Sequence, residues 1–262
     1  MATPTIIATG SQTGANPTGS LIITWSGSNS PQLNDLILVY AAASTSGITW
    51  TTTSPAFTWA TNAPVPATPV DDYQFGYRTA AGTEGTTLTF TASGSHACCV
   101  TTLLIRGANV GTNNGFDGTI PSGSGTVATA SSGIISAPSI TTSNSNDLLV
   151  YMAGINVLTG NTSVGDTITI PSGFSNAVTI AGTASTTSDP QCYMASKALG
   201  APGATGAITA TDTTNTTRNY AALLVAISGP PTPTQVTTPG MEDVFEPGII
   251  GIGQAMSTTN TW

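Results

Sequence analysis

Short stretches of apolar and β-branched residues recur along the chain, separated by clusters of glycine, proline, asparagine and serine. Several of them alternate between apolar and polar residues, as a half-buried β-strand does. In the segment 73–77, Tyr73, Phe75 and Tyr77 occupy every second position, which should place their rings on one face of a strand. No window of helical length repeats apolar residues at the period of an amphipathic helix. The pattern predicts an all-β fold.

The expected strands are short and spread over most of the chain. They span residues 21–25, 35–42, 48–50, 73–77, 86–91, 98–106, 147–152, 167–170, 192–197 and 220–227. The longest uninterrupted apolar runs, 36–43 and 220–227, fall well below the roughly 20 residues that a membrane-spanning helix needs. The first residues have no basic region followed by an apolar one, so we expect no cleaved secretory signal and no membrane partner.

A weak internal repeat connects the two halves of the chain. The segment 34–40 (NDLILVY) returns as 146–151 (NDLLVY), each time after a polar, turn-rich stretch. Further matches follow in the same order, at an offset of roughly 112 to 122 residues. These are 48–50 with 168–170, 54–57 with 171–174, Arg78 with Lys197, 86–91 with 206–211, and 100–107 with 221–229. We prefer duplication to the alternative that strand and turn chemistry converged on similar strings.

The repeat predicts two tandem jelly-roll-like or Ig-like antiparallel β-sandwich repeats, 1–108 and 137–229. A single pseudo-symmetric sandwich stays open as an alternative. Residues 109–136, rich in glycine, serine and threonine, are expected to be a surface connection. Residues 230–262 begin with a proline-rich linker and end in an extended C-terminal arm. The arm residues expected to bind a partner are Met241, Val244, Phe245, Ile249, Ile250, Ile252 and Trp262.

Charge is scarce, and this limits the possible functions. Of 262 residues only 6% are charged, with 4 Lys plus Arg, 12 Asp plus Glu and a net charge of −8. So few basic residues cannot neutralise a run of phosphates, and we expect no nucleic-acid partner. One His and 3 Cys make the usual zinc ligand sets hard to assemble. A calcium site using Asp71, Asp72 or the group Glu242, Asp243 and Glu246 is weighed and not preferred, so no metal or cofactor is expected.

Candidate catalytic residues do not form a recognisable motif. His96 is expected to be structural, because neither a carboxylate nor a nucleophile stands near it in a known pattern. The glycine- and serine-rich run 122–126 has neither the lysine nor the helix of a phosphate loop. An enzyme such as a glycan hydrolase would need two carboxylates together, and the sequence cannot bring Asp71, Asp117 or Asp166 into one site. We expect a protein that is not an enzyme.

Cysteine and aspartate positions suggest structural roles. Cys98 and Cys99 are adjacent in a strand, so they point to opposite faces and do not easily pair. Together with Cys192 they are interpreted as small buried hydrophobic residues in a reducing compartment. Asp35 and Asp147 occupy matching positions in the repeat, where an Asn-Asp turn that starts a strand is the preferred interpretation. The alternative is an ion pair with Arg106 or Lys197.

The duplicated pattern resembles β-sandwich structural proteins of tailed-bacteriophage virions. In these proteins a Gly-Asp-Leu-Leu-like strand start, a Pro-x-Gly-Trp-like loop and a closing strand that ends in Arg-Gly recur in pairs. Here Asn replaces the Gly before Asp35 and Asp147, and Phe174 stands where Trp is expected. Arg106-Gly107 matches the closing pair, whereas Ser228-Gly229 departs from it. The resemblance covers roughly residues 4–229.

The resemblance implies a structural protein of the virion, either a capsid decoration (cement) protein or a tail-associated protein. We prefer a decoration protein that binds the outer surface of a phage head and stabilises it. Its partners would be the major capsid protein and copies of itself as a homo-oligomer, with assembly in the host cytoplasm. No catalytic residue is carried over. The alternative is a tail-fibre, tailspike or adhesin-like module that recognises host glycans, with Trp25, Trp50 and Trp59 as stacking platforms.

Overall fold

The computed structural model describes most of the first 230 residues. The described segments are 3–14, 20–45, 47–52, 56–60, 72–120, 126–130, 133–156, 167–181, 190–213 and 218–230. Residues 1–231 form one compact unit. Every strand pairing in the described segments is antiparallel, which confirms the all-β prediction. No helix in these segments has the length and apolar character needed to cross a bilayer.

Two sheets come from the first half of the chain. Inner sheet 1 has the strand order β1 (Thr5–Gly14), β8 (Cys98–Arg106), β3 (Leu36–Ala43), β6 (Asp72–Thr79) and β5 (Thr58–Trp59). Outer sheet 1 has the order β2 (Ser20–Thr24), β7 (Thr87–Ala92) and β4 (Trp50–Thr52). A short 3-10 turn, η1 (Ser26–Ser28), follows β2.

Two corresponding sheets come from the second half. Inner sheet 2 has the order β9 (Thr126–Ala130), β18 (Arg218–Ile227), β12 (Leu148–Asn156), β15 (Pro190–Ala198) and β14 (Ser175–Ala181). Outer sheet 2 has the order β10 (Ile134–Ala137), β17 (Ile208–Asp212) and β13 (Ile168–Thr169). The remaining elements are the turn η2 (Asn113–Gly115) and the short pair β11 (Thr141–Thr142) and β16 (Gly203–Ala204).

The two halves pair their strands in the same order. In each inner sheet the central strand lies between the closing strand of that half and the strand that carries Arg78 or Lys197. The registers agree as well, because Leu36 lies opposite Ile105 and Leu148 lies opposite Ile227. Positions matched by the repeat therefore occupy matching places in the two sheets.

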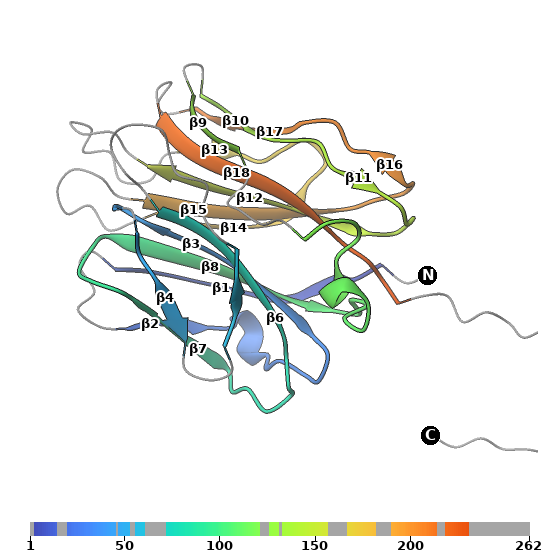
Figure 1. Ribbon diagram of the computed structural model, residues 1–262, viewed down its shortest axis with the longest axis horizontal. Coiled ribbons are helices and arrows are strands. Elements are labelled where there is room, and N and C mark those ends of the chain that lie inside the picture. Colours follow the sequence, from blue (N-terminus) through green and yellow to red (C-terminus); the bar gives the residue numbers. More distant parts are fainter. Residues whose placement is uncertain are drawn as a thin grey trace, which may run out of the picture. The chain divides into compact units, whose positions relative to one another are not determined.

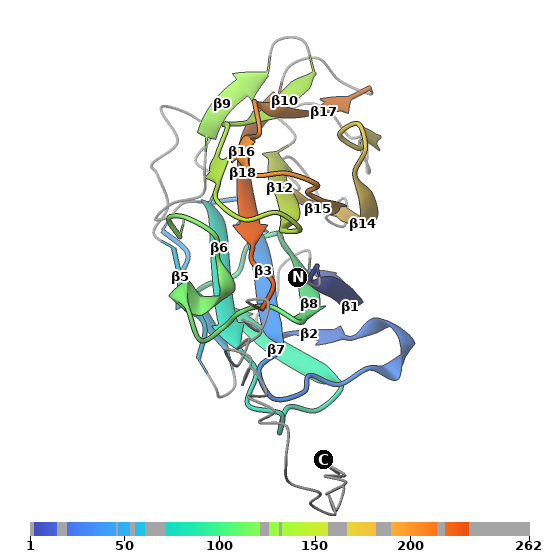
Figure 2. The ribbon, with the colours of Figure 1, turned by 90° about the vertical axis from the view of Figure 1, so that its right-hand side faces the viewer.

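The sheets stack as layers with three apolar cores between them (Figures 1 and 2). Alternate residues of β3 face different cores: Leu36 and Leu38 belong to the middle core between the two inner sheets, and Ile37 and Val39 to the core under outer sheet 1. Both faces of β3 are thus covered, and all of its residues are buried. This double burial explains why its sequence is an uninterrupted apolar run.

The middle core joins the two halves. The predicted common face of Tyr73, Phe75 and Tyr77 is confirmed, because all three rings lie in this core. The Tyr40 hydroxyl donates to the carbonyl oxygen of Ala221, at 3.2 Å, and so connects inner sheet 1 to inner sheet 2. Tyr73 packs so closely on Gly154 that a Cβ atom there would lie 2.2 Å from its ring. The two halves are in direct, dense contact.

The structure differs from the expected surface connection at 109–136. Phe116 is buried in the middle core and forms an isolated bridge with Ile227. Strand β9 belongs to inner sheet 2, and β10 belongs to outer sheet 2. A polar strand on the edge of a sheet lacks a strong apolar pattern, so its sequence is typical of a loop.

Candidate functional site

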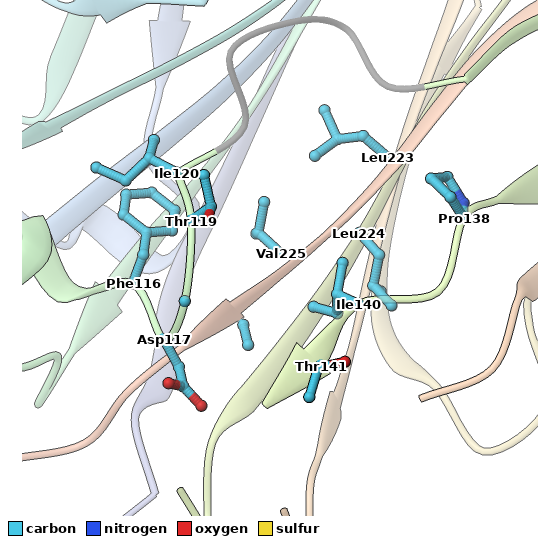
Figure 3. Close-up of a pocket in the computed structure, with 12 residues that line it drawn as sticks. Phe116, Asp117, Thr119, Ile120, Pro138, Ile140, Thr141, Leu223, Leu224 and Val225 are labelled. Carbon is cyan, nitrogen blue, oxygen red and sulfur yellow. The ribbon is translucent and has the colours of Figure 1, made fainter. Parts of the chain in front are cut away.

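The candidate site is a pocket of about 490 Å³ on the side of the second half. The floor is the closing strand β18, from Leu223 to Ala226, and the walls are the segments 116–120 and 138–141. Figure 3 shows Phe116 and Ile120 on one wall, Ile140 on the other and Asp117 at one end. The pocket is therefore mainly apolar, with a carboxyl group at its rim.

Asp117 is held in place by the turn that follows β11. The N–H and the hydroxyl of Ser143 donate to its carboxylate oxygens, and so does the N–H of Asn144, at 3.1 Å. Burial alone would raise the pKa of Asp117. Hydrogen bonds from the Asp147 carboxyl group, from Ser143 and from Asn144 outweigh burial and hold that pKa below its ordinary value. Asp117 is therefore a carboxylate at neutral pH.

Asp147, the second member of the pair, is completely buried at the start of β12. Among the described residues, no N–H or O–H group of another side chain or backbone donates to either of its carboxyl oxygens. Burial first, and then the hydrogen bond and negative charge of Asp117, raise the pKa of Asp147 to about 8. At neutral pH the raised pKa therefore favours the protonated form of Asp147 beside the ionised Asp117, so the pair carries one negative charge.

The matching position in the first half has a different partner. Asp35 is also buried, but Nε of Arg106 donates to its Oδ1 at 3.0 Å and Nη2 donates to its Oδ2 at 2.8 Å. The N–H of Gln32 adds a hydrogen bond of 2.8 Å. The hydrogen bond to Asp35 raises the pKa of Arg106. The alternative ion pair of the sequence analysis is thus present for Asp35.

The preferred interpretation, an Asn-Asp turn that starts a strand, is confirmed in both halves. Asn34 and Asn146 have positive φ angles of 69° and 68°. The N–H of Asn34 donates to Ala80, and the N–H of Asn146 donates to Leu199 in the same way. Lys197 lies next to Gly173 and makes no hydrogen bond with Asp147 in the described structure.

The carboxyl pair is suited to holding structure together. Asp117 ties the turn at 143–144 to the connection after η2, and Asp147 anchors the start of β12 beneath it. A glycosidase needs its two carboxyl groups about 5 Å or more apart with substrate between them. Here the two carboxyl groups lie close enough for each to shift the pKa of the other, and Asp147 is inaccessible to solvent. The Asp117–Asp147 pair therefore does not have the arrangement of a glycosidase site.

The other candidate residues have structural surroundings. His96 is half-buried in the turn between β7 and β8. Asp72 is buried and accepts hydrogen bonds from the N–H of Ile48 at 2.9 Å and from Gln74 at 3.0 Å, while burial raises its pKa. The segments that the structure describes contain no group of three or more His, Cys, Asp or Glu that could hold a metal ion.

Trp25 and Trp50, considered as stacking platforms, are buried in the core under outer sheet 1. They cannot stack on a glycan from there. Trp59 is half-buried and contacts the rings of Phe57 and Phe90.

Several candidate residues lie outside the described residues. They are Asp71, Asp166, Glu242, Asp243 and Glu246, together with the arm residues Met241, Val244, Phe245, Ile249, Ile250, Ile252 and Trp262.

The Asp117–Asp147 pair itself was missed by the sequence analysis. Its one signal was Ser228, which stands where the first half has Arg106 and so leaves Asp147 without a cation. Comparison of the chain with protein-family models, with curated proteins and with solved structures finds no match.

Proposed function

We propose that this chain is a non-enzymatic structural protein of a tailed-bacteriophage virion, a capsid decoration protein that binds the outer surface of the head. It would stabilise the particle through contacts with the major capsid protein and with copies of itself. The observation that carries this proposal is the character of the two outer sheets, whose solvent-facing side chains are hydroxyl-bearing or aliphatic.

The solvent-facing residues of the outer sheets form two uncharged surfaces. On outer sheet 1 they include Ser20, Ile22, Thr24, Thr87, Thr89 and Thr91, and on outer sheet 2 they include Ile134, Ser136, Thr209 and Thr211. Each surface also contains an exposed isoleucine, Ile22 at 56% and Ile134 at 48% exposure. Both surfaces combine methyl groups with hydroxyl groups.

Such surfaces are suited to contact with another protein. The buried centre of a protein interface is depleted in charged residues, because a charge that loses its water must be compensated. Burying the hydroxyl group of threonine or serine costs less free energy than burying a charge. The hydroxyl group can also donate or accept hydrogen bonds across the contact. An isoleucine among them adds apolar area.

The layered core supports the same proposal. The middle core joins the two halves over many residues, so that both outer sheets belong to one compact body. A decoration protein with two fixed outer faces would resist the relative movement of the subunits that it contacts. The ionisable groups Asp35 and Arg106, and Asp117 and Asp147, are engaged inside this body.

We also propose the finer architecture. The equal strand orders and registers support a gene duplication into two β-sandwich repeats, jelly-roll-like or Ig-like, packed through their inner sheets. The arm at 241–262 would dock on a neighbouring subunit through the apolar side chains predicted from the sequence.

The experiment is a binding assay on purified phage heads that lack decoration. The full-length chain is incubated with the heads, the particles are sedimented, and the bound chain is quantified against the major capsid protein. We expect a fixed stoichiometry, and particles that withstand a higher temperature. Deletion of 241–262 should abolish binding.

A matched control and a competing assay make the result decisive. Replacing Phe245, Ile249 and Ile250 with serine should weaken binding as strongly as the deletion, whereas Thr258→Ser and Thr259→Ser should leave it unchanged. The same protein is applied to host cells and to host glycans. Binding to cells or glycans without binding to heads would overturn the proposal in favour of a host-recognition module.

A further inference from the structure

Two cysteines from different halves meet in the middle core. Cys99 on β8 and Cys192 on β15 are both fully buried, and their sulfur atoms lie 2.7 Å apart. The Cys192 thiol also faces the carbonyl oxygen of Cys99, at 3.4 Å. Cys98 points to the other side of inner sheet 1, into the core under outer sheet 1. All three thiols are free in this structure.

We propose that Cys99 and Cys192 form an oxidisable dithiol that closes to a disulfide between inner sheet 1 and inner sheet 2. Non-bonded heavy atoms settle at about 3.5–4.0 Å, whereas two bonded sulfurs are about 2.05 Å apart. The two sulfurs are already closer than ordinary packing brings atoms together. The two side chains therefore need to move only slightly for their sulfur atoms to reach the distance of a disulfide bond.

The reaction is a thiol–disulfide exchange with a small disulfide such as oxidised glutathione. One cysteine, as thiolate, attacks a sulfur of the oxidant, forms a mixed disulfide and releases the first thiol. The other cysteine then attacks the mixed disulfide and releases the second thiol. Both cysteine sulfurs are oxidised, the small disulfide is reduced to two thiols, and the two cysteine protons end on these thiols.

Burial determines when this reaction takes place. Burial first, and then the neighbouring Cys192 thiol, raise the pKa of Cys99 well above its ordinary value, so that the reactive thiolate is rare in the folded protein. A small disulfide also cannot reach two fully buried sulfurs. The bond should therefore form while the chain folds or opens, and it should then be protected from reductants.

The bond would connect the two halves covalently at the centre of their contact. It would close a loop between positions that are 93 residues apart in the sequence. A cross-link of this length removes much of the freedom of the unfolded chain. We expect it to lower the equilibrium constant for unfolding by about 10²- to 10³-fold.

The test uses the full-length chain, refolded once with dithiothreitol and once with a mixture of reduced and oxidised glutathione. Free thiols are then labelled with a maleimide under denaturing conditions and counted by intact mass. Because the chain contains 3 Cys, we expect three labels after the reducing treatment and one after the oxidising treatment. The oxidised protein should need more urea to unfold.

Peptide mapping identifies the bond. Trypsin cuts after Arg78, Arg106 and Lys197, so Cys98 and Cys99 fall in peptide 79–106 and Cys192 falls in peptide 107–197. The two peptides should stay joined without reductant. The matched control Cys98→Ala should keep the link and lose the remaining label, whereas Cys99→Ala and Cys192→Ala should abolish the link.

Three labels after oxidising refolding would overturn the proposal. It would equally be overturned by a bond between Cys98 and Cys99 within peptide 79–106, or by loss of the link in Cys98→Ala. The map of the unaltered chain decides these outcomes even where a cysteine variant fails to fold.

Discussion

Asp35 and Asp147 occupy matching places in the two halves, but their buried carboxyl groups are stabilised in different ways. Each follows an asparagine with positive φ, each starts the central strand of an inner sheet, and each has a buried carboxyl group. Asp35 is paired with Arg106 of the closing strand. Asp147 has Ser228 at the matching position and keeps its proton beside the ionised Asp117.

The difference shows that the turn, and not the ion pair, is common to both halves. A buried carboxyl group must meet a cation, accept several hydrogen bonds or become neutral, because an isolated buried charge is costly. The first half supplies the cation, and in the second half the protonated form of Asp147 is favoured beside Asp117. The two arrangements should respond differently to mutation, and Asp147 adds a pH dependence of its own, so the comparison can be tested.

The largest expected effect is the pH dependence that Asp147 contributes to stability. The native protein holds the Asp147 proton up to about pH 8, whereas the unfolded chain loses it near the ordinary aspartate pKa of about 3.9. Between these values the native state binds more protons than the unfolded state. The free energy of unfolding should therefore fall as pH rises, by up to about 1.4 kcal/mol per pH unit, and level off above about pH 8.

Urea unfolding of the wild type and of Asp147→Asn between pH 5 and pH 9 measures this effect. The asparagine side chain does not titrate, so the slope that Asp147 contributes should be absent from its curve. Equal slopes in both proteins would contradict the raised pKa of Asp147.

Removal of the cation from the first half should give the next largest effect. Arg106→Met leaves the Asp35 carboxylate buried with only the N–H of Gln32 as a partner among the described hydrogen bonds. We expect a loss of about 2–3 kcal/mol at pH 7, less than for a fully buried pair because the Arg106 side chain is 37% exposed. Adding Asp35→Asn to this variant should recover part of the lost stability, because the buried carboxylate is then gone. If the two single changes in the free energy of unfolding simply add up in the double variant, the result would argue against the pair.

A third difference between the halves lies in the middle core. Register places Gly154 of β12 at the position that Ala42 occupies in β3, and Tyr73 fills the space left by the missing Cβ atom. Gly154→Ala should destabilise the protein by about 1–3 kcal/mol, because the ring must move in a densely packed core. Gly111→Ala, with nothing within 4 Å of the new Cβ atom, is the control and should change thermal stability little.

The smallest expected effect concerns the support of the carboxyl pair. Ser143→Ala removes the hydroxyl group that donates to Asp117, while the N–H groups of Ser143 and Asn144 remain. We expect a loss of about 1 kcal/mol and a higher pKa for Asp117, measured by calorimetry and by NMR titration. The exposed Ser30→Ala serves as control, and an equal effect in both variants would show that the hydroxyl contributes nothing specific.

The sequence predicted most of the long strands that are apolar on at least one face. The span 98–106 agrees with β8, and the common face of Tyr73, Phe75 and Tyr77 is present. Strands β1, β9 and β14 are among the strands that were not predicted. They lie at the edges of the inner sheets and are rich in threonine, serine, glycine and alanine, so their pairing depends on a neighbouring strand more than on their own residues.

The candidate site was predicted only in part. The sequence singled out Asp35 and Asp147 and named Arg106 as an alternative partner, and the structure contains that pair for Asp35. Asp117 was considered only as one of several scattered carboxylates. Its contact with Asp147 depends on how the connection after η2 folds back over β18. No local pattern of residues predicts the course of that connection.

The sequence by itself determined the fold class, the turns at Asn34 and Asn146, and the match between the two halves, because these depend on alternation and on local backbone preferences. Only the tertiary structure decided that the inner sheets share a core, that Cys99 meets Cys192, and that Asp147 keeps its proton. An apolar run shows that a strand is buried, but not which surface covers each face. That choice is made by packing between residues far apart in the chain.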